Sequence, residues 1–526
     1  MDSRLLKRLR EPDCYPGHHE SVDLKQTHMS VICLAGDDVY KLKKPVRFPF
    51  ADFSTVEKRE HFCHEELRLN RRLCPELYRE VVPLYKTPDG SWSFCLHAGE
   101  IVDHAVLMYR LPAEKMMDRL LEEDAVNPAR VRHLARIMVT FHQEADHGPK
   151  VLELGDPSNL REAALYNFSE TESVRDTIFD AELHDVVEKR TRAEFDRLLP
   201  RLRERAGRGR IVDGHGDLHA RNICLTDPPA IYDCIEFNPG LRCEDVTAEN
   251  AFLAMDLIYR GHPELAHEYI RVYLSESGDE EQQLLLPALI SYRAMVRAKI
   301  AAFSAKDPDL EDDRRNHERE SARHHLQLAA SSLVCREKWL VIGCGLPATG
   351  KTTLLERLAR RSGWPCLSTD VIRKQLAGCD AGDELPERYY ETDFSQRTYG
   401  EMISRAEDAL KDGPVILDAN FGKAETREKA LHLAGKTGAR VLIIWLRADE
   451  ETIRQRLAER DQDADATSDA DLKVYQLLKD RFEPPSDAEG IPFLQLDGDD
   501  EVDHSLNAVL AHLLRAESGG RMSNPG

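Results

Sequence analysis

Apolar residues along the chain follow two spacings, and each spacing predicts a different kind of secondary structure. Short apolar runs on either side of Gly36-Asp37-Asp38 predict a two-stranded hairpin over residues 31–46. Apolar residues that recur three and four positions apart predict helices at residues 54–74, 131–142 and 181–205. Further strand-like segments lie around residues 81–85, 92–96 and 105–109. The first part of the chain should therefore form a sheet with one helix, and the next part should be mainly helical.

The pattern changes again near residue 338. Helical spacing continues through residues 249–274 and 284–303, and the dense charges of residues 307–325 indicate a solvated helix or a linker. From Lys338 onward, apolar strands alternate with helical segments, and the strands are expected at residues 339–344, 414–417 and 441–446. This alternation is typical of a parallel α/β sheet.

The length of 526 residues predicts about three or four compact units. We place a strand-rich unit at residues 1–110, a helical unit at 111–334, an α/β unit at 335–515 and a flexible tail at 516–526. The expected fold class is thus α/β and α+β multidomain.

Composition narrows the classes of partner. The 72 Lys and Arg residues against 94 Asp and Glu give a net charge of −22, which argues against general attraction to nucleic acid or an anionic membrane while leaving a local basic groove open. Twelve cysteines without a C-x-x-C pair indicate reduced thiols and no zinc site. We find neither a signal peptide nor an apolar run that could span a membrane, so a cytoplasmic protein is expected.

One contiguous motif carries phosphate-binding chemistry. Gly345-Leu346-Pro347-Ala348-Thr349-Gly350-Lys351-Thr352 matches G-x-x-x-x-G-K-S/T, after an apolar strand and before an amphipathic segment that begins at Thr353. The glycines let successive N–H groups face a phosphate, and the N-terminus of the following helix favours negative charge. Lys351 would reach the terminal phosphates of ATP, and the Thr352 hydroxyl would ligate Mg²⁺.

Two acidic positions would complete that site. Asp418 ends the strand predicted at 414–417 and is suited to holding Mg²⁺, and the alternative is an aspartate that only begins a turn. Asp370 and Arg373 would lie on one helix face. The Asp370 carboxylate would take a hydroxyl proton, and the Arg373 cation would steady the phosphate. The alternative for Asp370 is a helix N-cap.

A second constellation lies in the first half of the chain. Asp217 and Asn222, in His215-Gly-Asp-Leu-His-Ala-Arg-Asn222, are followed by an apolar strand and Asp233. This order matches a kinase-type catalytic loop and its metal-binding aspartate. Asp217 would accept the proton of a substrate hydroxyl, while Asn222 and Asp233 would supply oxygen ligands for Mg²⁺.

The C-terminal half, over about residues 338–515, resembles P-loop small-substrate kinases such as gluconate kinases and polynucleotide 5′-hydroxyl kinases. Its marks are the Gly345–Thr352 loop, the Asp370/Arg373 pair and Asp418. The resemblance implies that Asp370 activates the acceptor hydroxyl and that the segment from Arg454 to Arg460, with Arg456, closes over ATP as a lid. A solvated helix face is the alternative for these arginines.

Residues 20–330 resemble the aminoglycoside phosphotransferase and choline-kinase branch of the kinase-like fold, which implies a bilobal domain. By this likeness Lys41 grips the α- and β-phosphates, with Lys43 as a substitute, and Glu66 is its ion-pair partner, with Glu65 as a near-equal choice. Met108-Tyr109-Arg110 would be the hinge that binds adenine.

The N-terminal segment also departs from the kinase pattern. No G-x-G-x-x-G precedes Lys41, and no A-P-E follows Asp233. Glu236 and Asp245 follow instead, either to assist the metal or, as we favour, to pair with Arg242. His28 receives no role.

The whole chain resembles bacterial fusions of an aminoglycoside phosphotransferase-like domain with a P-loop ATP-binding predicted kinase of AAA type. This resemblance, together with the two candidate sites, predicts an ATP- and Mg²⁺-dependent phosphotransferase with two nucleotide sites that acts on hydroxyl groups of small molecules. Two alternatives stay open, namely a C-terminal polynucleotide 5′-hydroxyl kinase and an ATP-gated regulator with one non-catalytic site.

Overall fold

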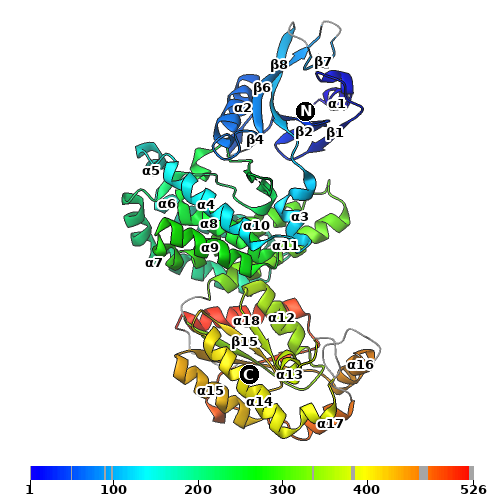
Figure 1. Ribbon diagram of the computed structural model, residues 1–526, viewed down its shortest axis with the longest axis vertical. Coiled ribbons are helices and arrows are strands. Elements are labelled where there is room, and N and C mark those ends of the chain that lie inside the picture. The colour runs from blue at the N-terminus through cyan, green and yellow to red at the C-terminus, as the bar shows by residue number, and fades with distance from the viewer. Residues whose placement is uncertain are drawn as a thin grey trace. The chain divides into compact units, whose positions relative to one another are not determined.

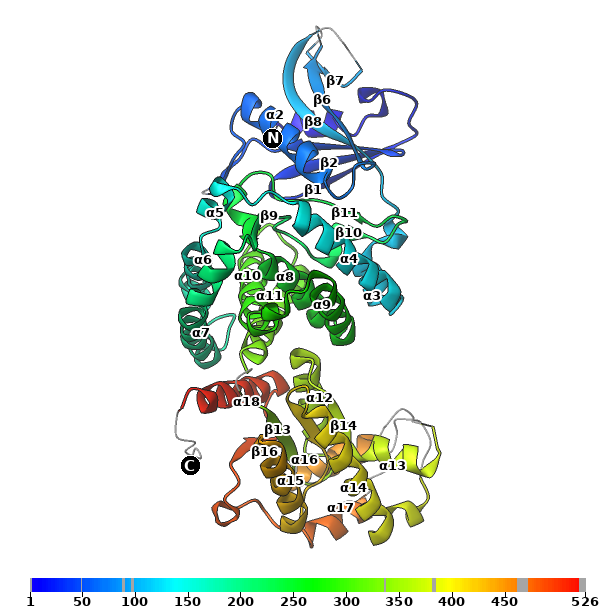
Figure 2. The same ribbon diagram turned by 60° about the vertical axis from the view of Figure 1, so that its left-hand side comes forward.

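The computed structural model describes residues 2–48, 50–87, 90–95, 99–334, 337–380, 385–460 and 472–519 (Figures 1 and 2). The chain divides into two compact units, one formed by Met1–Ala163 with Asp196–Leu289 and the other by Ala164–Phe195 with Ile290–Gly526. Of the tail expected at 516–526, the first two residues belong to a helix that ends at Glu517, and residues 520–526 lie outside the described part of the chain. The chain combines α/β and α+β architecture.

An antiparallel sheet occupies the beginning of the first unit. Its strands are, in spatial order, β1 (Val22–Gln26), β2 (Ser30–Ala35), β3 (Asp38–Lys43), β8 (Glu100–Tyr109), β6 (Tyr78–Lys86) and β7 (Trp92–Ser93). The hairpin expected over 31–46 is confirmed, because β2 and β3 pair with Ile32 opposite Lys41. A separate short hairpin joins β4 (Arg47–Phe48) to β5 (Ala51–Asp52).

Helix α2 (Val56–Asn70) packs on β6 and β8 and confirms the helix expected over 54–74. The Thr55 hydroxyl accepts a hydrogen bond from the Lys58 N–H and caps the helix. Its buried positions include Cys63, Glu66 and Asn70, which recur every three or four residues and face the sheet. A carboxylate at one of these positions needs a cationic partner.

The rest of the first unit is mainly helical. Its helices are α1 (Ser3–Arg8), α3 (Met117–Glu122), α4 (Pro128–Glu144), α5 (Pro149–Leu154), α8 (Val246–Tyr259) and α9 (Pro263–Ser277). Two short antiparallel pairs accompany them, β9 (Ile211–Asp213) with β12 (Cys243–Asp245) and β10 (Ile223–Cys224) with β11 (Ala230–Ile231). The helical pattern over 249–274 is two helices, because Gly261 takes a positive φ and Pro263 begins the next helix.

Three helices pass from one unit into the other along the chain, α6 (Pro157–Thr171), α7 (Ala181–Gly207) and α10 (Leu286–Ser304). The second unit further contains α11 (Asp312–Ser332). The solvated helix or linker expected over 307–325 is solvated only in its first part, because α11 is buried at Ala322 and from His325 to Ser331. This apolar end packs against α12 and α18.

A five-stranded sheet forms the centre of the second unit. All its strands run parallel, in the order β14 (Cys366–Ser368), β15 (Val415–Asp418), β13 (Trp339–Cys344), β16 (Arg440–Arg447) and β17 (Phe493–Asp497). One face carries α12 (Lys351–Ser362) and α18 (Val502–Glu517), and the other carries α13 (Thr369–Ala377), α14 (Thr392–Ala409) and α15 (Ala424–Thr437) (Figure 1). Helices α16 (Glu450–Arg460) and α17 (Leu472–Lys479) follow β16. The parallel α/β sheet expected from residue 338 onward is confirmed.

The central strand β13 leads directly into the Gly345–Thr352 loop, so the carboxyl edge of the sheet positions that loop. Among the described helices, none combines the length and apolar character that crossing a bilayer demands.

Candidate functional site

In the first unit, a loop between β9 and β10 brings together Asp217 and Asn222. The Asn222 side-chain amide donates to Asp217 Oδ2 and to the Asp217 carbonyl, both at 3.0 Å. His219 Nε2 lies 3.3 Å from the same carboxylate oxygen. The Asp217 carboxylate is about one-third exposed, so it is both oriented by neighbours and open to a substrate.

A buried carboxylate on α8 holds the backbone of this loop. Glu249 Oε1 accepts hydrogen bonds from the N–H groups of His215 and Gly216, each at 2.6 Å. Its other oxygen lies 2.7 Å from His142 Nε2, and His142 Nδ1 lies 2.7 Å from the Tyr273 hydroxyl. Burial raises the pKa of Glu249, but the hydrogen bond and charge of His142 outweigh this effect and lower the pKa to about 2. Glu249 is therefore an anion that fixes the two residues before Asp217.

Glu249, His142 and Tyr273 belong to none of the motifs that the sequence presents. They come from α8, α4 and α9 and meet only through folding. A signal was nevertheless present, because Glu249 is a charged residue inside a strongly apolar helical run. Such a residue is almost never fully buried without a partner.

Lys41, Glu66 and Asp233 meet at the end of β3. Lys41 Nζ lies 2.7 Å from Glu66 Oε1 and 2.5 Å from Asp233 Oδ1. Burial lowers the pKa of Lys41, but Asp233 and Glu66 raise it well above its ordinary value, so the ammonium stays charged. Asp233 has a φ of +64°, a strained conformation that aims its partly exposed carboxylate at this lysine.

The neighbouring alternatives are spatially distinct. Lys43 Nζ also pairs with Glu66, at 2.7 Å from Oε2, and with Glu236, but its side chain is 1% exposed, against 13% for Lys41. Lys41 is thus the lysine that a ligand can reach. Glu65 lies on the outer side of α2 and pairs with Arg68.

The pairing expected between Arg242 and the two acids Glu236 and Asp245 is wrong. Arg242 donates instead to Asp213 at 2.5 Å, because the β9–β12 pairing sets Asp213 opposite Cys243. Asp245 caps α8 and binds the fully buried Arg205. The role favoured for both acids was structural, and each has a structural cation, Lys43 for Glu236 and Arg205 for Asp245.

Met108 lies near the end of β8, in the segment expected to bind adenine. It belongs to an apolar cluster with Val39, and Leu111, Met116 and Tyr232 pack against this cluster. The next two N–H groups are already donated, from Tyr109 to the Leu77 carbonyl and from Arg110 to the Asp37 carbonyl. Adenine contact at this segment stays a prediction. The N–H groups of Tyr109 and Arg110 are already used, so hydrogen bonds to adenine would have to come from other backbone groups of the segment.

In the second unit, the predicted phosphate loop curls between β13 and α12. Gly345 and Gly350 take positive φ values of +144° and +91°, and a Cβ on Gly345 would stand 2.5 Å from the Leu446 carbonyl oxygen. Glycine is therefore required at position 345. Ala348 also has a positive φ. The loop residues Leu346 and Pro347 are half-buried, Ala348 and Thr349 are buried, and Thr353 is exposed in the first turn of α12.

Lys351 and Thr352 begin α12 and face different partners. Lys351 Nζ donates to the Leu346 carbonyl at 2.7 Å, so the lysine folds over its own loop. The Thr352 hydroxyl donates to Asp418 Oδ2 at 2.9 Å. Burial and the nearby Asp370 raise the pKa of Asp418, whereas Lys351 and the Thr352 hydrogen bond lower it less. A bound cation would relieve this unfavourable burial of negative charge.

Asp370 and Arg373 lie on one face of α13, as their spacing predicts. Arg373 donates to Asp370 Oδ1 at 2.9 Å, and its guanidinium stands 4.6 Å from the centre of the Tyr390 ring. The N-cap of α13 is Ser368, whose hydroxyl accepts from the Asp370 N–H. The alternative of Asp370 as the N-cap is therefore wrong, and its carboxylate is partly exposed.

Arg456 of α16 reaches the phosphate loop. It donates to the carbonyls of Ala348 at 3.3 Å and Gly498 at 2.9 Å. Arg454 instead pairs with Glu450 on its own helix. The Arg460 side chain lies outside the described residues. Of the two described arginines in the proposed lid, only Arg456 is directed at the nucleotide loop.

Both sites have the donor set that a magnesium–nucleotide complex requires. Among the described residues, no group of three or more His, Cys, Asp or Glu side chains is arranged to hold a metal ion by itself. Mg²⁺ is usually held by one or two carboxylates together with phosphate oxygens and water. Asp233 with Asn222, and Asp418 with Thr352, fit that description, and the lysines Lys41 and Lys351 fit the phosphates.

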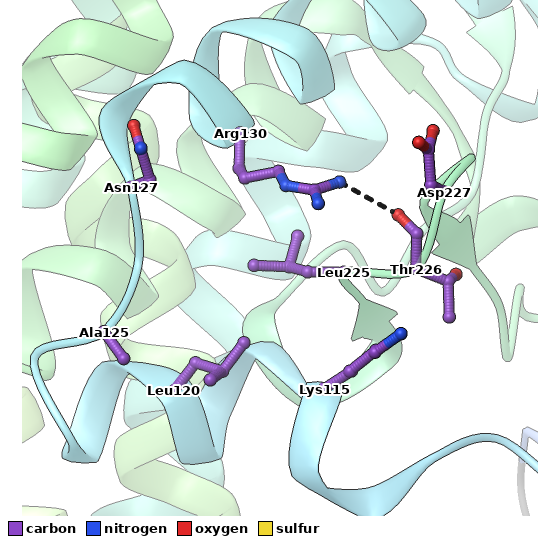
Figure 3. A pocket seen from close by; sticks show the side chains of 8 residues that line it. All are labelled: Lys115, Leu120, Ala125, Asn127, Arg130, Leu225, Thr226 and Asp227. Carbon is purple, nitrogen blue, oxygen red and sulfur yellow. Dashed lines mark hydrogen bonds between the residues drawn. The ribbon is translucent and has the colours of Figure 1, made fainter.

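A cavity of about 280 Å³ opens elsewhere in the first unit, beside α3, the start of α4 and the β10–β11 connection (Figure 3). Arg130 projects into it and donates to the Thr226 carbonyl at 3.2 Å. None of the predicted site residues lines this cavity, and we assign it no role.

Comparisons with known proteins match two separate parts of the chain, and each part contains one of the two candidate sites. Residues 39–285 match the phosphotransferase enzyme family, and residues 340–485 match an AAA domain. Uncharacterized proteins of Mycobacterium tuberculosis and Mycobacterium bovis are 30% identical over 482 residues, which cover 89% of this chain and 92% of theirs.

Solved structures give weaker likenesses. A gluconokinase from Sinorhizobium meliloti is 18% identical, with a TM-score of 0.26 over 35% of this chain and 96% of its own. A sugar kinase from a Janibacter species is 15% identical, with a TM-score of 0.26 over 33% of this chain and 92% of its own.

The matched domains and the geometry of their sites define a kinase-type phosphotransferase with nucleotide-binding domains. The chain belongs to the family of its mycobacterial relatives. In this chain a domain of the phosphotransferase enzyme family precedes a P-loop kinase-like AAA domain. The fusion expected from the sequence is confirmed.

Proposed function

We propose that this protein transfers the γ-phosphoryl group of ATP, bound with Mg²⁺, to hydroxyl groups of small molecules at two separate sites in the cytoplasm. The observation that carries the proposal is the partly exposed Asp217 carboxylate, oriented by Asn222 on a loop that Glu249 anchors. A base placed in this way serves a hydroxyl acceptor. A domain that only bound nucleotide would not need it.

At the N-terminal site, Asp217 takes the proton of the acceptor hydroxyl. The oxygen of that hydroxyl bonds to the γ-phosphorus, and the bond from the γ-phosphorus to the β–γ bridging oxygen breaks, so that this oxygen leaves with ADP. Lys41, held by Glu66, binds the phosphates. Asn222 and Asp233 would hold the metal, which would neutralise charge on the phosphates. The apolar cluster at Met108 would receive the adenine ring.

At the C-terminal site, the phosphate loop from Gly345 to Thr353 and Arg456 bind the nucleotide. Thr352 and Asp418 would hold the metal, and Lys351 would donate to the terminal phosphates in place of the Leu346 carbonyl. Asp370 accepts the proton of the acceptor hydroxyl, and Arg373 steadies the transferred phosphoryl group.

The experiment follows label from γ-³²P-ATP into a metabolite extract, into an oligonucleotide with a free 5′-hydroxyl, and into buffer without acceptor. We expect labelled small molecules, with one set lost in Asp217→Asn and another in Lys351→Ala or Asp370→Asn. The exposed aspartates Asp176 and Asp408 supply matched controls, since Asp→Asn there should change nothing.

The alternatives are separate outcomes of the same assay. Label in the oligonucleotide that depends on Asp370 would identify the C-terminal domain as a polynucleotide kinase. If only one site labels an acceptor, the other is a nucleotide-binding regulator. Label in neither pool would contradict the proposal.

A further inference from the structure

Four phenylalanines gather around Phe237, on the segment that follows Asp233, and no step of the proposed reaction uses them. Phe48 and Phe50 stack with ring centres 5.4 Å apart and planes 8° from parallel. Phe237 lies 5.8 Å from Phe50 and 6.4 Å from Phe53. Phe53 is fully buried, whereas Phe50 is 46% exposed. We call Phe48, Phe50 and Phe237 the aromatic platform.

The platform is built onto both halves of the proposed N-terminal site. Phe53, which supports Phe237, lies under the Lys43 ammonium at 5.1 Å, and Glu236, next to Phe237, pairs with that lysine. The Ile235 N–H donates to the His215 carbonyl at 3.1 Å, two residues from Asp217. The platform is thus tied to the catalytic loop and to the strand that carries Lys41.

The segment after Phe237 also borders Asp217. A Cβ on Gly216 would stand 2.9 Å from the Leu241 carbonyl oxygen, so this backbone packs directly against the residue before Asp217. Leu241 presents an exposed apolar side chain. Exposed apolar groups therefore lie on the segment that flanks the proposed base.

Three carboxylates on or beside this segment are already paired with cations. Asp213 pairs with Arg242, Glu236 with Lys43 and Asp245 with Arg205. A site for a polycationic acceptor needs carboxylates that are free to meet several ammonium groups. These three are not free, whereas the face of an exposed phenyl ring such as that of Phe50 favours planar apolar groups.

We infer that the acceptor of the N-terminal site is an alcohol that carries an aromatic or planar apolar group, which stacks on Phe50 and Phe237 while its hydroxyl faces Asp217. The inference rests on the proposed function of that site and narrows its substrate class. It excludes polyamine sugars as the preferred acceptors.

The test compares three probes, phenyl β-D-glucoside, methyl β-D-glucoside and kanamycin, by saturation-transfer NMR and titration with the full-length protein. The two glucosides present the same hydroxyls and differ only in the ring. We expect the phenyl glucoside to bind about tenfold more tightly than the methyl glucoside, since stacking and burial of one ring are worth that much. Saturating MgADP should leave its binding intact, because the apolar cluster at Met108, proposed to receive adenine, shares no residue with the platform.

Variants locate the effect. Phe50→Ala and Phe237→Ala should remove the preference for the phenyl glucoside and leave the affinity for ATP unchanged. Phe50 is exposed, so its replacement leaves folding undisturbed. Phe303→Ala, an exposed phenylalanine on α10, is the matched control and should keep the full preference.

Several results would overturn the inference: no phenyl binding, equal binding of the two glucosides, a preference that survives Phe50→Ala, tighter binding of kanamycin, or displacement by MgADP, which would make the platform part of the adenine site. Because binding is measured without turnover, the outcome is independent of the phosphoryl-transfer assay. Loss of transfer with intact platform binding would refute the proposed function alone.

Discussion

Removing the Glu249 carboxylate should uncouple the Asp217 loop from the helix that holds it. In Glu249→Ala, the His215 and Gly216 N–H groups lose their shared acceptor and His142 loses its charged partner. Hydrogen bonds to a charged group contribute roughly 1.5–3 kcal/mol each. The two backbone bonds alone therefore account for about 3–6 kcal/mol of the energy that orders this loop.

Two effects should follow. A loss of about 3 kcal/mol lowers the melting temperature of a unit this size by roughly 6–12 °C. A catalytic group displaced by about 1 Å can cost about 10²-fold in rate. We therefore expect kcat of the N-terminal site to fall about 10²-fold while the KM for ATP stays within about threefold, because Lys41 and Asp233 keep their positions.

The assay uses a Lys351→Ala background, which silences the C-terminal site, and the acceptor found in the extract. Hydrogen exchange at His215 and Gly216 reports loop order directly. Glu249→Gln keeps an acceptor oxygen and should fall between Glu249→Ala and the parent, while Glu153→Ala, at an exposed position on α5, should match the parent. Unchanged kcat together with unchanged amide protection in a folded Glu249→Ala protein would refute the reasoning.

Two further predictions concern stability. Arg205 is fully buried and donates four hydrogen bonds to Asp245 and Asp279 and one to the Thr247 hydroxyl, none longer than 3.1 Å. Arg205→Ala should therefore lower the unfolding free energy by about 3–5 kcal/mol. Chemical denaturation measures this loss, with exposed Arg203→Ala as control, and a loss under about 1 kcal/mol would contradict the prediction. Burial lowers the pKa of His184 and His215, so the unfolded chain binds more protons below about pH 6.5 and stability should fall as pH drops from about 7.5 to 5.5. Melting curves across that range should show a shallower slope for His184→Gln, and an identical slope would be evidence against burial of a neutral His184.

Contiguous signals in the sequence predicted the fold well. The Gly345–Thr352 loop, its preceding strand and its following helix need only local geometry, and β13 and α12 confirm them. The hairpin at Gly36 and the helix over 54–74 are local in the same sense. The sequence also placed the acids of both sites, whose proposed roles await the assays above.

Features that depend on distant pairing were less accessible. Lys41 and Lys43 share one face of β3, and only the packing of α2 and the loop after Asp233 shows which one a ligand can reach. The pairing assigned to Arg242 relied on closeness in sequence, whereas strand pairing delivered Asp213 to it. Glu249 and His142 are 107 residues apart, so spacing along the chain carried no sign of their contact.

The contact between Lys41 and Asp233 has a consequence for the order of ligand arrival. This carboxylate is neutralised by an ammonium 2.5 Å away. A lone divalent ion would have to evict the lysine and leave it beside Glu66 only, whereas a triphosphate can receive the lysine as it is released. We expect bare Mg²⁺ to bind weakly here and nucleotide and metal to enter as one complex, so that a starved enzyme keeps its metal ligands shielded from other cations.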